Sequence, residues 1–513
     1  MTPDLGGVGF STEPCAGPVL RAMFNIDRIR SDLEEFTSLV DEEHYLNGAG
    51  LKDKAEFTRI YEKFGHLFNK ETIDFVREYS KTVEGDEERR VGYLKAFLVG
   101  DYMQNRVKEL SDQVLTMEVE STVEVEGRTM PFRQAAVVLA NESDHYKRGE
   151  IFQARNRVMD RLNPVLEERF RLMHETAGEL GYAGYVELYE DIKSFDLKAL
   201  EAILRPLLEK TRALYHMRMS RIVKERTGLA LGEAEKHDVS FTFRANQFDG
   251  FFPKRNAVPS LVRTLEHMGV DLAGQRNIHL DVEERPKKDP RAFVSPVRVP
   301  GDIRLVVMPQ GGHDDYATLF HEAGHAEHFG CTRADLPVEY RYLGDNSVTE
   351  GFAFLMEYLT GNRAWLSRFT GMKNSAAFLE FARTYKLYFL RRYAAKLSYE
   401  IALHTKGLES APLRYKEILE SALAFQHPES HYLIDVDDGF YTANYLRAWI
   451  FEAQLRMILK ETFGENWFEK KSAGIQLQKW WSLGQKFRVE EMLRDLGYTG
   501  LDIRPLLDDL QAN

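Results

Sequence analysis

The sequence predicts a mainly α-helical protein with two short β-hairpins. Apolar residues recur at helical spacing among charged residues over most of the 513-residue chain, whereas period-two alternation is confined to two short segments. Hydrophobic residues make up 43% of the chain and charged residues 29%, which is ordinary for a globular protein. There is no internal repeat. We therefore expect one continuous unit rather than a string of separate domains.

The N-terminal part divides into a leader and a helical region. Residues 1–22 are rich in Gly and Pro, and we expect them to form a loose leader before ordered structure begins near Met23. From there to about residue 115, acidic and basic residues alternate around apolar stripes, which predicts helices. Residues 23–513 are predicted to form the single folded unit.

A hairpin and a set of long helices follow. Residues 116–134 alternate at period two around Glu126 and Gly127, which predicts a short β-hairpin. Helical periodicity returns from about residue 141 to residue 225. Pro164 lies inside this region and is expected to mark a helix boundary or a kink, because proline cannot donate the helical hydrogen bond.

A second hairpin is expected at residues 291–299 and 302–308, which are rich in β-formers and are joined by Pro300 and Gly301. Its second strand leads towards the most informative motif of the chain. An edge strand at such a place can pair with an extended peptide through backbone hydrogen bonds, without selecting particular side chains. The alternative is that the hairpin only supports the following helix.

The motif is His-Glu-x-x-His, at residues 321–325, within a segment of helical periodicity. Positions i and i+4 share one face of a helix, so His321 and His325 can offer two imidazole nitrogens to one zinc ion. Glu322 lies about 100° around the helix from His321, where it can act as general base towards an attacking water. A catalytic zinc ion needs a third protein ligand.

That third ligand is expected to be a carboxylate. The continuation with a third histidine is excluded, because the positions for its glycine and histidine hold His328 and Cys331. Asp345 and Glu350 lie 20 and 25 residues after His325 and are the remaining candidates. His328 is expected to pack or to support the site rather than to bind the metal.

Glu350 is favoured over Asp345 because it opens an apolar-periodic helix. Ser347 is expected to be the N-cap of this helix. Gly351 is expected to let it approach the zinc helix closely. The alternative role for Glu350 is the acidic partner of Ser347 in a capping box.

A second region of interest is residues 427–445, a Gly-containing interruption in the C-terminal helices. It carries His431, Tyr441 and Tyr445. Peptide hydrolysis needs a hydrogen-bond donor for the oxyanion that develops on the substrate, and an imidazole or a phenol can supply it. Packing is the alternative role for each, since the chain contains 23 tyrosines.

Charge and cysteine content narrow the class of protein. The net charge is −12 and no basic stripe with interleaved aromatic residues occurs, so nucleic acid is not expected as a partner. The two cysteines, Cys15 and Cys331, do not form a disulfide framework. No secretory signal and no apolar run of about 20 residues is present, so we expect a cytoplasmic protein that does not bind membranes.

The sequence resembles the thimet oligopeptidase/oligoendopeptidase F family of zinc peptidases. These are gluzincins, and their fold is distantly shared with angiotensin-converting enzyme. The matching segments are residues 291–296, 303–308 and 314–328. Weaker similarity extends to residues 178–185, 439–449 and 484–498.

The resemblance implies a two-lobed helical clamshell of the neurolysin/angiotensin-converting-enzyme type. A small β-hairpin or sheet would lie beside the zinc helix, and a deep central channel would admit short unfolded peptides. The zinc-binding core would span about residues 286–460. The family's glutamate ligand corresponds to Glu350, and its second acid, seven residues further on, corresponds to Glu357.

The implied activity is zinc-dependent hydrolysis of peptide bonds in short oligopeptides. One Zn²⁺ would be held by His321, His325 and Glu350, with Glu322 as general base. The oxyanion would be stabilised by Tyr445, with His431 or Tyr441 as further candidates.

Glu357 and Asp345 are candidates to orient the zinc histidines. For Glu357 the alternative is a solvated helix face.

Two other functions stay open. A carboxy-terminal dipeptidase would need a cation to hold the substrate carboxylate, and Arg447 and Lys460 are available. A non-catalytic peptide-binding protein is the third reading. The sequence does not predict the oligomeric state.

Overall fold

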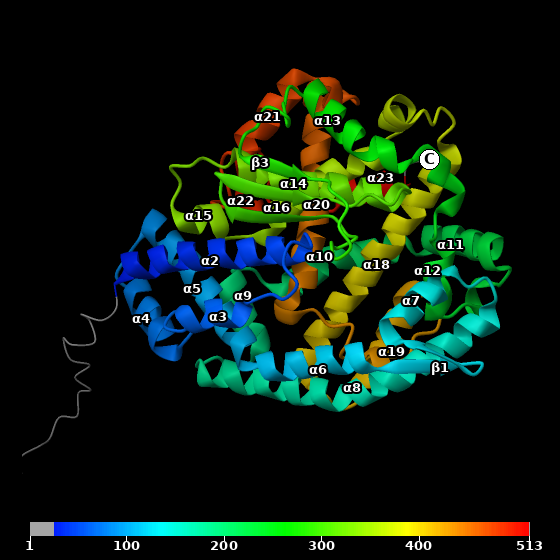
Figure 1. Ribbon diagram of the computed structural model, residues 1–513, viewed down its shortest axis with the longest axis horizontal. Coiled ribbons are helices and arrows are strands. Elements are labelled where there is room, and N and C mark those ends of the chain that lie inside the picture. The colour runs from blue at the N-terminus through cyan, green and yellow to red at the C-terminus, as the bar shows by residue number, and fades with distance from the viewer. Residues whose placement is uncertain (1–24, 512–513) are drawn as a thin grey trace, which may run out of the picture.

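The structure is a computed structural model that describes residues 25–511, so the leader expected at residues 1–22 lies outside the described residues. The chain is mainly helical, with two small sheets, as predicted (Figure 1). The helices before the second sheet are α2 (Ile26–Gly48), α3 (Phe57–Lys63), α4 (Lys70–Ser80), α5 (Gly85–Arg106), α6 (Lys108–Glu120), α7 (Phe132–Asn141), α8 (His145–Glu179), α9 (Tyr185–Lys193), α10 (Leu197–Lys210), α11 (Arg212–Thr227), α12 (Lys236–Thr242) and α13 (Ala257–His267). The helices after it are α14 (His313–Cys331), α15 (Val338–Tyr342), α16 (Asn346–Glu357), α17 (Arg363–Trp365), α18 (Ala376–Lys406), α19 (Ala411–Leu423), α20 (Tyr441–Phe463), α21 (Lys471–Trp481), α22 (Val489–Asp495) and α23 (Arg504–Gln511).

Local sequence explains several helix boundaries. The side chains of Asn69, Asp144 and Asp196 accept hydrogen bonds from backbone amides in the first turns of α4, α8 and α10. The prediction that Pro164 marks a boundary or kink differs from the structure, in which α8 runs without a break through Pro164. Apolar packing along this 35-residue helix outweighs the loss of one backbone hydrogen bond.

The first hairpin is shorter than expected. Strands β1 (Thr122–Val125) and β2 (Arg128–Pro131) pair antiparallel around Glu126 and Gly127. Both turn residues have positive φ, at 50° and 74°, as a two-residue hairpin turn requires. Residues 116–120, predicted as strand, belong to helix α6 instead.

The second sheet contains three strands, β3 (Ile278–Asp281), β4 (Phe293–Arg298) and β5 (Asp302–Val306), in the order β3-β5-β4. β4 and β5 form the predicted hairpin. β3 pairs parallel to β5 and was not predicted. It has only four residues, two of them polar, and so carries little strand signal. β4 is the edge strand that lies next to α14.

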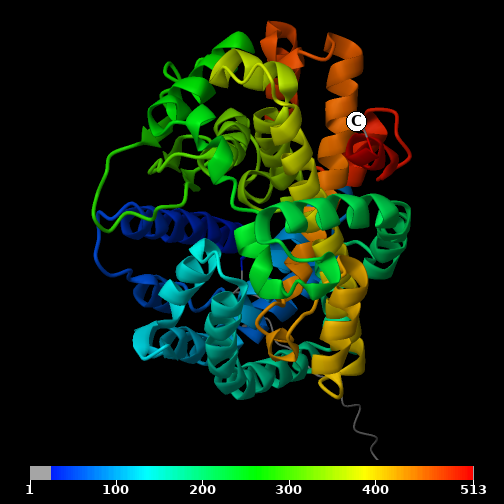
Figure 2. The same ribbon diagram turned by 90° about the vertical axis from the view of Figure 1, so that its right-hand side faces the viewer.

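The buried apolar residues form two large clusters and a small third one. One large cluster gathers residues of the N-terminal helices, α8 to α11 and α19, and the other gathers the second sheet, α13, α14, α16 and α21. α18 and α20 contribute to both, through Leu387 and Leu446 in the first and Phe378 and Leu455 in the second. In both views the yellow helix α18 extends from the part holding the sheet towards α6 and α8 (Figure 2).

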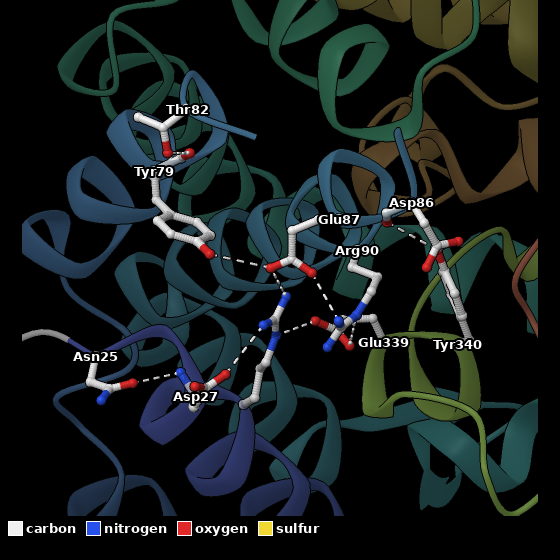
Figure 3. A network of polar contacts seen from close by, with 10 residues as sticks. Asn25, Asp27, Tyr79, Thr82, Asp86, Glu87, Arg90, Glu339 and Tyr340 are labelled. Carbon is white, nitrogen blue, oxygen red and sulfur yellow. Dashed lines mark hydrogen bonds and ion pairs between the residues drawn. The ribbon is translucent and has the colours of Figure 1, made fainter. Parts of the chain in front are cut away.

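A buried ion network fastens the N-terminal helices to the segment between α14 and α16. Arg30 of α2 donates to Glu339 of α15 at 2.5 Å and to Glu87 of α5 at 2.7 Å. Arg90 of α5 also donates to Glu339, at 3.2 Å (Figure 3). Glu339 is fully buried, so these charge-assisted bonds hold α2 and α5 against α15. Within residues 25–511, no helix is long and apolar enough to span a membrane.

Candidate active site

Two closely packed helices, α14 and α16, carry the residues of the motif. A Cβ atom at Gly324 would lie 2.6 Å from the Cα atom of Ala353 on α16, so glycine is required at this crossing. The expectation that Gly351 provides the close approach is corrected, because Gly351 faces the ring of Phe451 on α20. The two glycines together let α16 lie tightly between α14 and α20.

Three ligand atoms converge between these helices. The Nε2 atoms of His321 and His325 lie 3.4 Å and 3.7 Å from Oε2 of Glu350. All three lie within 4.8 Å of one another. Glu350 is 5% exposed, and its Oε2 atom has no hydrogen-bond partner among the described residues. A buried carboxylate oxygen without a partner is costly unless a cation occupies the space in front of it. Two imidazoles and one carboxylate are a donor set that suits zinc.

The far sides of both imidazoles are held by hydrogen bonds. Nδ1 of His321 lies 2.9 Å from Oε2 of Glu357, and Nδ1 of His325 lies 2.7 Å from Oγ1 of Thr349. A neutral imidazole that donates from Nδ1 keeps its lone pair on Nε2, the atom that faces Glu350. Glu357 therefore has the orienting contact that was expected of it. Thr349 was not predicted, because a threonine one position before Glu350 carries no signal of its own.

The charges of the site are strongly coupled. Burial lowers the pKa of His321, but the adjacent carboxylates of Glu350 and Glu357 raise it, to about 10 overall. Burial lowers the pKa of His325 to about 3. Burial acts to raise the pKa of Glu350, yet the nearby imidazoles of His321 and His325 bring it below its ordinary value. The carboxylates of Glu350 and Glu357 therefore favour a positive charge at this position, which the protonated imidazole of His321 supplies when no metal ion is bound.

Glu322 lies beside this cluster and is oriented by the edge strand. The backbone N–H of Val294 on β4 donates to Oε2 of Glu322 at 3.1 Å. Burial, with a contribution from Glu350, raises the pKa of Glu322 to about 7. A carboxylate whose pKa lies near neutral pH is suited to accept and return a proton.

The outer side of β4 is covered in part by α2. Oγ of Ser295 donates to the backbone carbonyl of Asp41 at 2.5 Å. The rings of His44 and Phe293 meet edge to face, with centroids 5.0 Å apart. The edge strand is therefore in contact with both the general-base candidate and the N-terminal helices.

The tyrosines at the start of α20 have different environments. The hydroxyl of Tyr441 donates to Oε1 of Glu350 at 2.8 Å, so Tyr441 supports a metal-ligand candidate. Tyr445, one helical turn later, lines a cavity next to the site, and its ring lies 5.0 Å from that of Tyr441. Of the two phenols, Tyr441 has its hydroxyl engaged by Glu350, whereas Tyr445 lines two cavities beside the site.

The turn before α20 fixes the position of Tyr441. Gly439 and Phe440 both have positive φ, at 60° and 54°. The backbone N–H of Gly439 donates to the hydroxyl of Tyr185 at 2.9 Å. Glu400 of α18 is fully buried and accepts a hydrogen bond from the backbone N–H of Asp437 at 2.8 Å. These bonds stabilise a turn whose backbone is unfavourable for Phe440.

His431 is placed differently from the two tyrosines. It lies in the short 3-10 helix η6 (Glu429–His431), and its Nε2 atom bonds to Oδ1 of Asn156 on α8 at 3.0 Å. Its ring packs against Phe152, with centroids 5.6 Å apart. These contacts join His431 to α8 rather than to the His321 cluster, so the expected catalytic role of His431 is not supported by its position.

Two cavities adjoin the site. One, of about 590 Å³, is lined by residues of α14, α16, α18 and α20, His321 and Glu357 among them. The other, of about 530 Å³, lies against α8 and residues 433–438 and includes Tyr441. Tyr393 and Tyr445 line both cavities, so the two meet at these side chains.

Several further sequence-based expectations are corrected. Asp345, not Ser347, caps α16, and its side chain accepts a hydrogen bond from the amide of Ser347. Asp345 also accepts two bonds from Arg447 at 2.8 Å, so its contacts are with this guanidinium rather than with His321 or His325. Arg447 and Lys460, the two cations available to hold a substrate carboxylate, both form ion pairs with acidic side chains. Arg447 bonds to Asp345 and Glu490, and Lys460 bonds to Glu465 at 2.9 Å.

A second group of His and Asp residues was not predicted. His145 Nδ1 lies 3.4 Å from His237 Nε2 and 3.0 Å from Asp238 Oδ1. Arg148 donates to the same Oδ1 atom through Nε at 2.9 Å and Nη2 at 2.7 Å. The backbone N–H of Glu235 donates to Oδ2 at 2.9 Å. Both oxygens of Asp238 are therefore occupied, and a guanidinium already balances its charge.

Comparison of the sequence with protein-family models and with curated proteins finds no match to either.

Proposed function

We propose that the protein is a zinc-dependent peptidase that hydrolyses internal bonds of short unfolded peptides. The observation that carries the proposal is the convergence of His321 and His325 on an unpartnered, buried oxygen of Glu350, with Glu322 beside it. Zinc held by these three side chains would supply a Lewis acid that polarises the substrate carbonyl and lowers the pKa of water.

In the proposed reaction, Glu322 accepts the proton of the attacking water and later gives it to the leaving amine. The amide of Val294 keeps the Glu322 carboxylate in place. Tyr445 donates a hydrogen bond to the oxyanion of the tetrahedral intermediate. Tyr441 has a supporting role, because its hydroxyl is engaged by Glu350.

We also propose the clamshell arrangement and membership of the thimet oligopeptidase/oligoendopeptidase F family. In support, the apolar core consists of two large clusters joined by α18 and α20, and two cavities meet beside the metal-ligand candidates. A channel formed by these two cavities would admit an extended peptide and exclude a folded domain.

The test is digestion of a mixture of peptides about 5–20 residues long, followed by mass spectrometry of the products. The wild type is compared before and after chelation and after zinc is restored. Each peptide is supplied with a free and with an amidated C-terminus. Internal cuts that depend on zinc and ignore amidation support the proposal. If only C-terminal dipeptides are released, and only from peptides with a free C-terminus, the protein is a carboxy-terminal dipeptidase instead. If the zinc-loaded protein cleaves none of the peptides, a peptide-binding role is favoured.

A further inference from the structure

The cavity beside His321 extends along the first two turns of α14. Asp314, Ala317, Thr318 and His321 line one side of it. Asp314 lies seven residues before His321, which corresponds to about 10 Å along the helix axis. An extended peptide advances about 3.3 Å per residue, so Asp314 lies about three residues away from a bond positioned at His321.

The opposite wall of the cavity is aromatic. Tyr385, Phe389 and Tyr393 follow one another at i, i+4 and i+8 on α18, and all three line the cavity. Trp449 of α20 meets Tyr393 at 5.3 Å and stacks on Phe354 of α16 at 4.9 Å between ring centroids. Aromatic faces attract cations as well as apolar groups.

The charge near Asp314 is negative. The Asp315 carboxylate accepts the backbone N–H groups of Gln310 and Gly311, in the segment before α14, whereas the Asp314 side chain is 89% exposed. Nearby Glu357 adds a further carboxylate to the cavity wall.

The charges at the other end of the cavity are paired. Nζ of Lys386 lies 3.6 Å from carboxylate oxygens of both Glu452 and Asp509. Arg456 binds the same two acids, through Nε to Glu452 at 2.6 Å and Nη1 to Asp509 at 3.0 Å. Among the side chains that line the whole cavity, carboxylates outnumber cations: Asp314, Glu357, Glu452 and Asp509 against Arg383 and Lys386.

We propose that this cavity binds a cationic group of the substrate, the guanidinium of arginine or the ammonium of lysine, about three residues from the bond that is cut. Asp314 supplies the charge, and the aromatic wall formed by α18, Trp449 and Phe354 supplies cation–π contact. The inference deepens the proposed peptidase function and rests on it, because the position of the bond is taken from His321.

The test measures binding rather than turnover, so its result is separate from that of the hydrolysis experiment. Fluorescent peptides carry one arginine two to four residues from a central bond, on either side, and matched peptides carry neutral citrulline instead. Anisotropy gives the Kd for metal-free Glu322→Gln protein. We expect the arginine peptide to bind about tenfold more tightly at the preferred position, with the advantage decreasing as salt rises.

Two variants assign the preference to the cavity. Asp314→Asn is expected to reduce the arginine-over-citrulline ratio to about twofold or less, whereas Asp160→Asn, an exposed acid on α8, is expected to leave it unchanged. Equal binding of arginine and citrulline peptides at every position would overturn the subsite. An arginine preference that survives Asp314→Asn would overturn it too, and so would failure of both peptides to bind. Loss of hydrolysis with the binding preference intact would count against the peptidase alone.

Discussion

Two places in the described chain bring two histidines and one carboxylate together, and they differ in what the carboxylate already binds. At His321, His325 and Glu350, one carboxylate oxygen is buried without a partner and faces both Nε2 atoms. At His145, His237 and Asp238, the distances are equally short, but Arg148 occupies the oxygen that a metal would need.

The difference shows that close donor atoms alone do not define a metal site. A guanidinium and a divalent cation compete for the same carboxylate, and a buried cluster tolerates little uncompensated charge. The two clusters also differ in surroundings, since His321 lines a cavity and is flanked by a general-base candidate. We therefore expect metal at the first cluster and a structural hydrogen-bond network at the second.

The largest expected effect concerns metal content. His325→Ala should reduce bound zinc from one equivalent per chain to nearly none and abolish hydrolysis, because two ligands do not hold a catalytic zinc ion. His237→Ala should retain one equivalent. Elemental analysis after dialysis against a weak chelator measures both. If the wild type binds a second equivalent of zinc and His237→Ala loses it, the second cluster is also a metal site and the distinction between the clusters is wrong.

The second cluster, His145, His237 and Asp238, should contribute to the free energy of unfolding. Arg148→Ala leaves Asp238 as a buried carboxylate without its cation, and we expect the free energy of unfolding to fall by about 3–5 kcal/mol. Urea denaturation monitored by circular dichroism measures the change. Arg333→Ala, which removes an exposed pair with Asp335, is the matched control and should leave the free energy of unfolding almost unchanged. Similar losses in both variants would contradict the structural role.

The hydroxyl of Tyr445, beside the first cluster, should affect kcat. Tyr445→Phe is expected to lower kcat by about 10²–10³ with zinc content unchanged, because the oxyanion loses one donor. Tyr146→Phe, an exposed tyrosine next to His145, should have no effect. Steady-state kinetics on one peptide decide this. If Tyr441→Phe has the larger effect on kcat while Tyr445→Phe has none, the two roles must be exchanged.

The smallest expected effect is a pH dependence at the second cluster. Burial lowers the pKa of His237 to about 4, whereas an unfolded histidine titrates near 6.5. Between these values the unfolded chain binds a proton that the folded chain does not, so the free energy of unfolding decreases as pH falls from 6.5 to 4.

A His237→Gln variant should show a weaker decrease over this window, measured by denaturation at several pH values. His279→Gln, which changes a half-exposed histidine, is the control and should keep the wild-type slope. Parallel curves for His237→Gln and the wild type would contradict a neutral, buried His237.

Local patterns predicted the parts of the site that lie within one helix. The i, i+4 spacing placed His321 and His325 on one face of α14, and the structure brings Glu350 opposite them. Contacts between distant segments were not predictable, such as those of Thr349 with His325 and of Arg148 with Asp238.

The helix cap shows where local chemistry was insufficient. Both Ser347 and Asp345 are good N-cap residues, and the sequence favoured the serine. The structure uses Asp345 because its carboxylate also binds Arg447, 102 residues away. Strand β3 was missed for a related reason, since its pairing with β5 rather than its own composition makes it a strand.

The central claim is that Glu322 is the general base of a zinc site built from His321, His325 and Glu350. The most direct measurement is kcat/KM on one internally cleaved peptide for the wild type and Glu322→Gln, each loaded with one zinc equivalent. We expect kcat/KM of the variant to be about 10²–10⁴-fold lower than that of the wild type, while the variant still binds zinc and peptide. Equal rates for the two zinc-loaded proteins would contradict it.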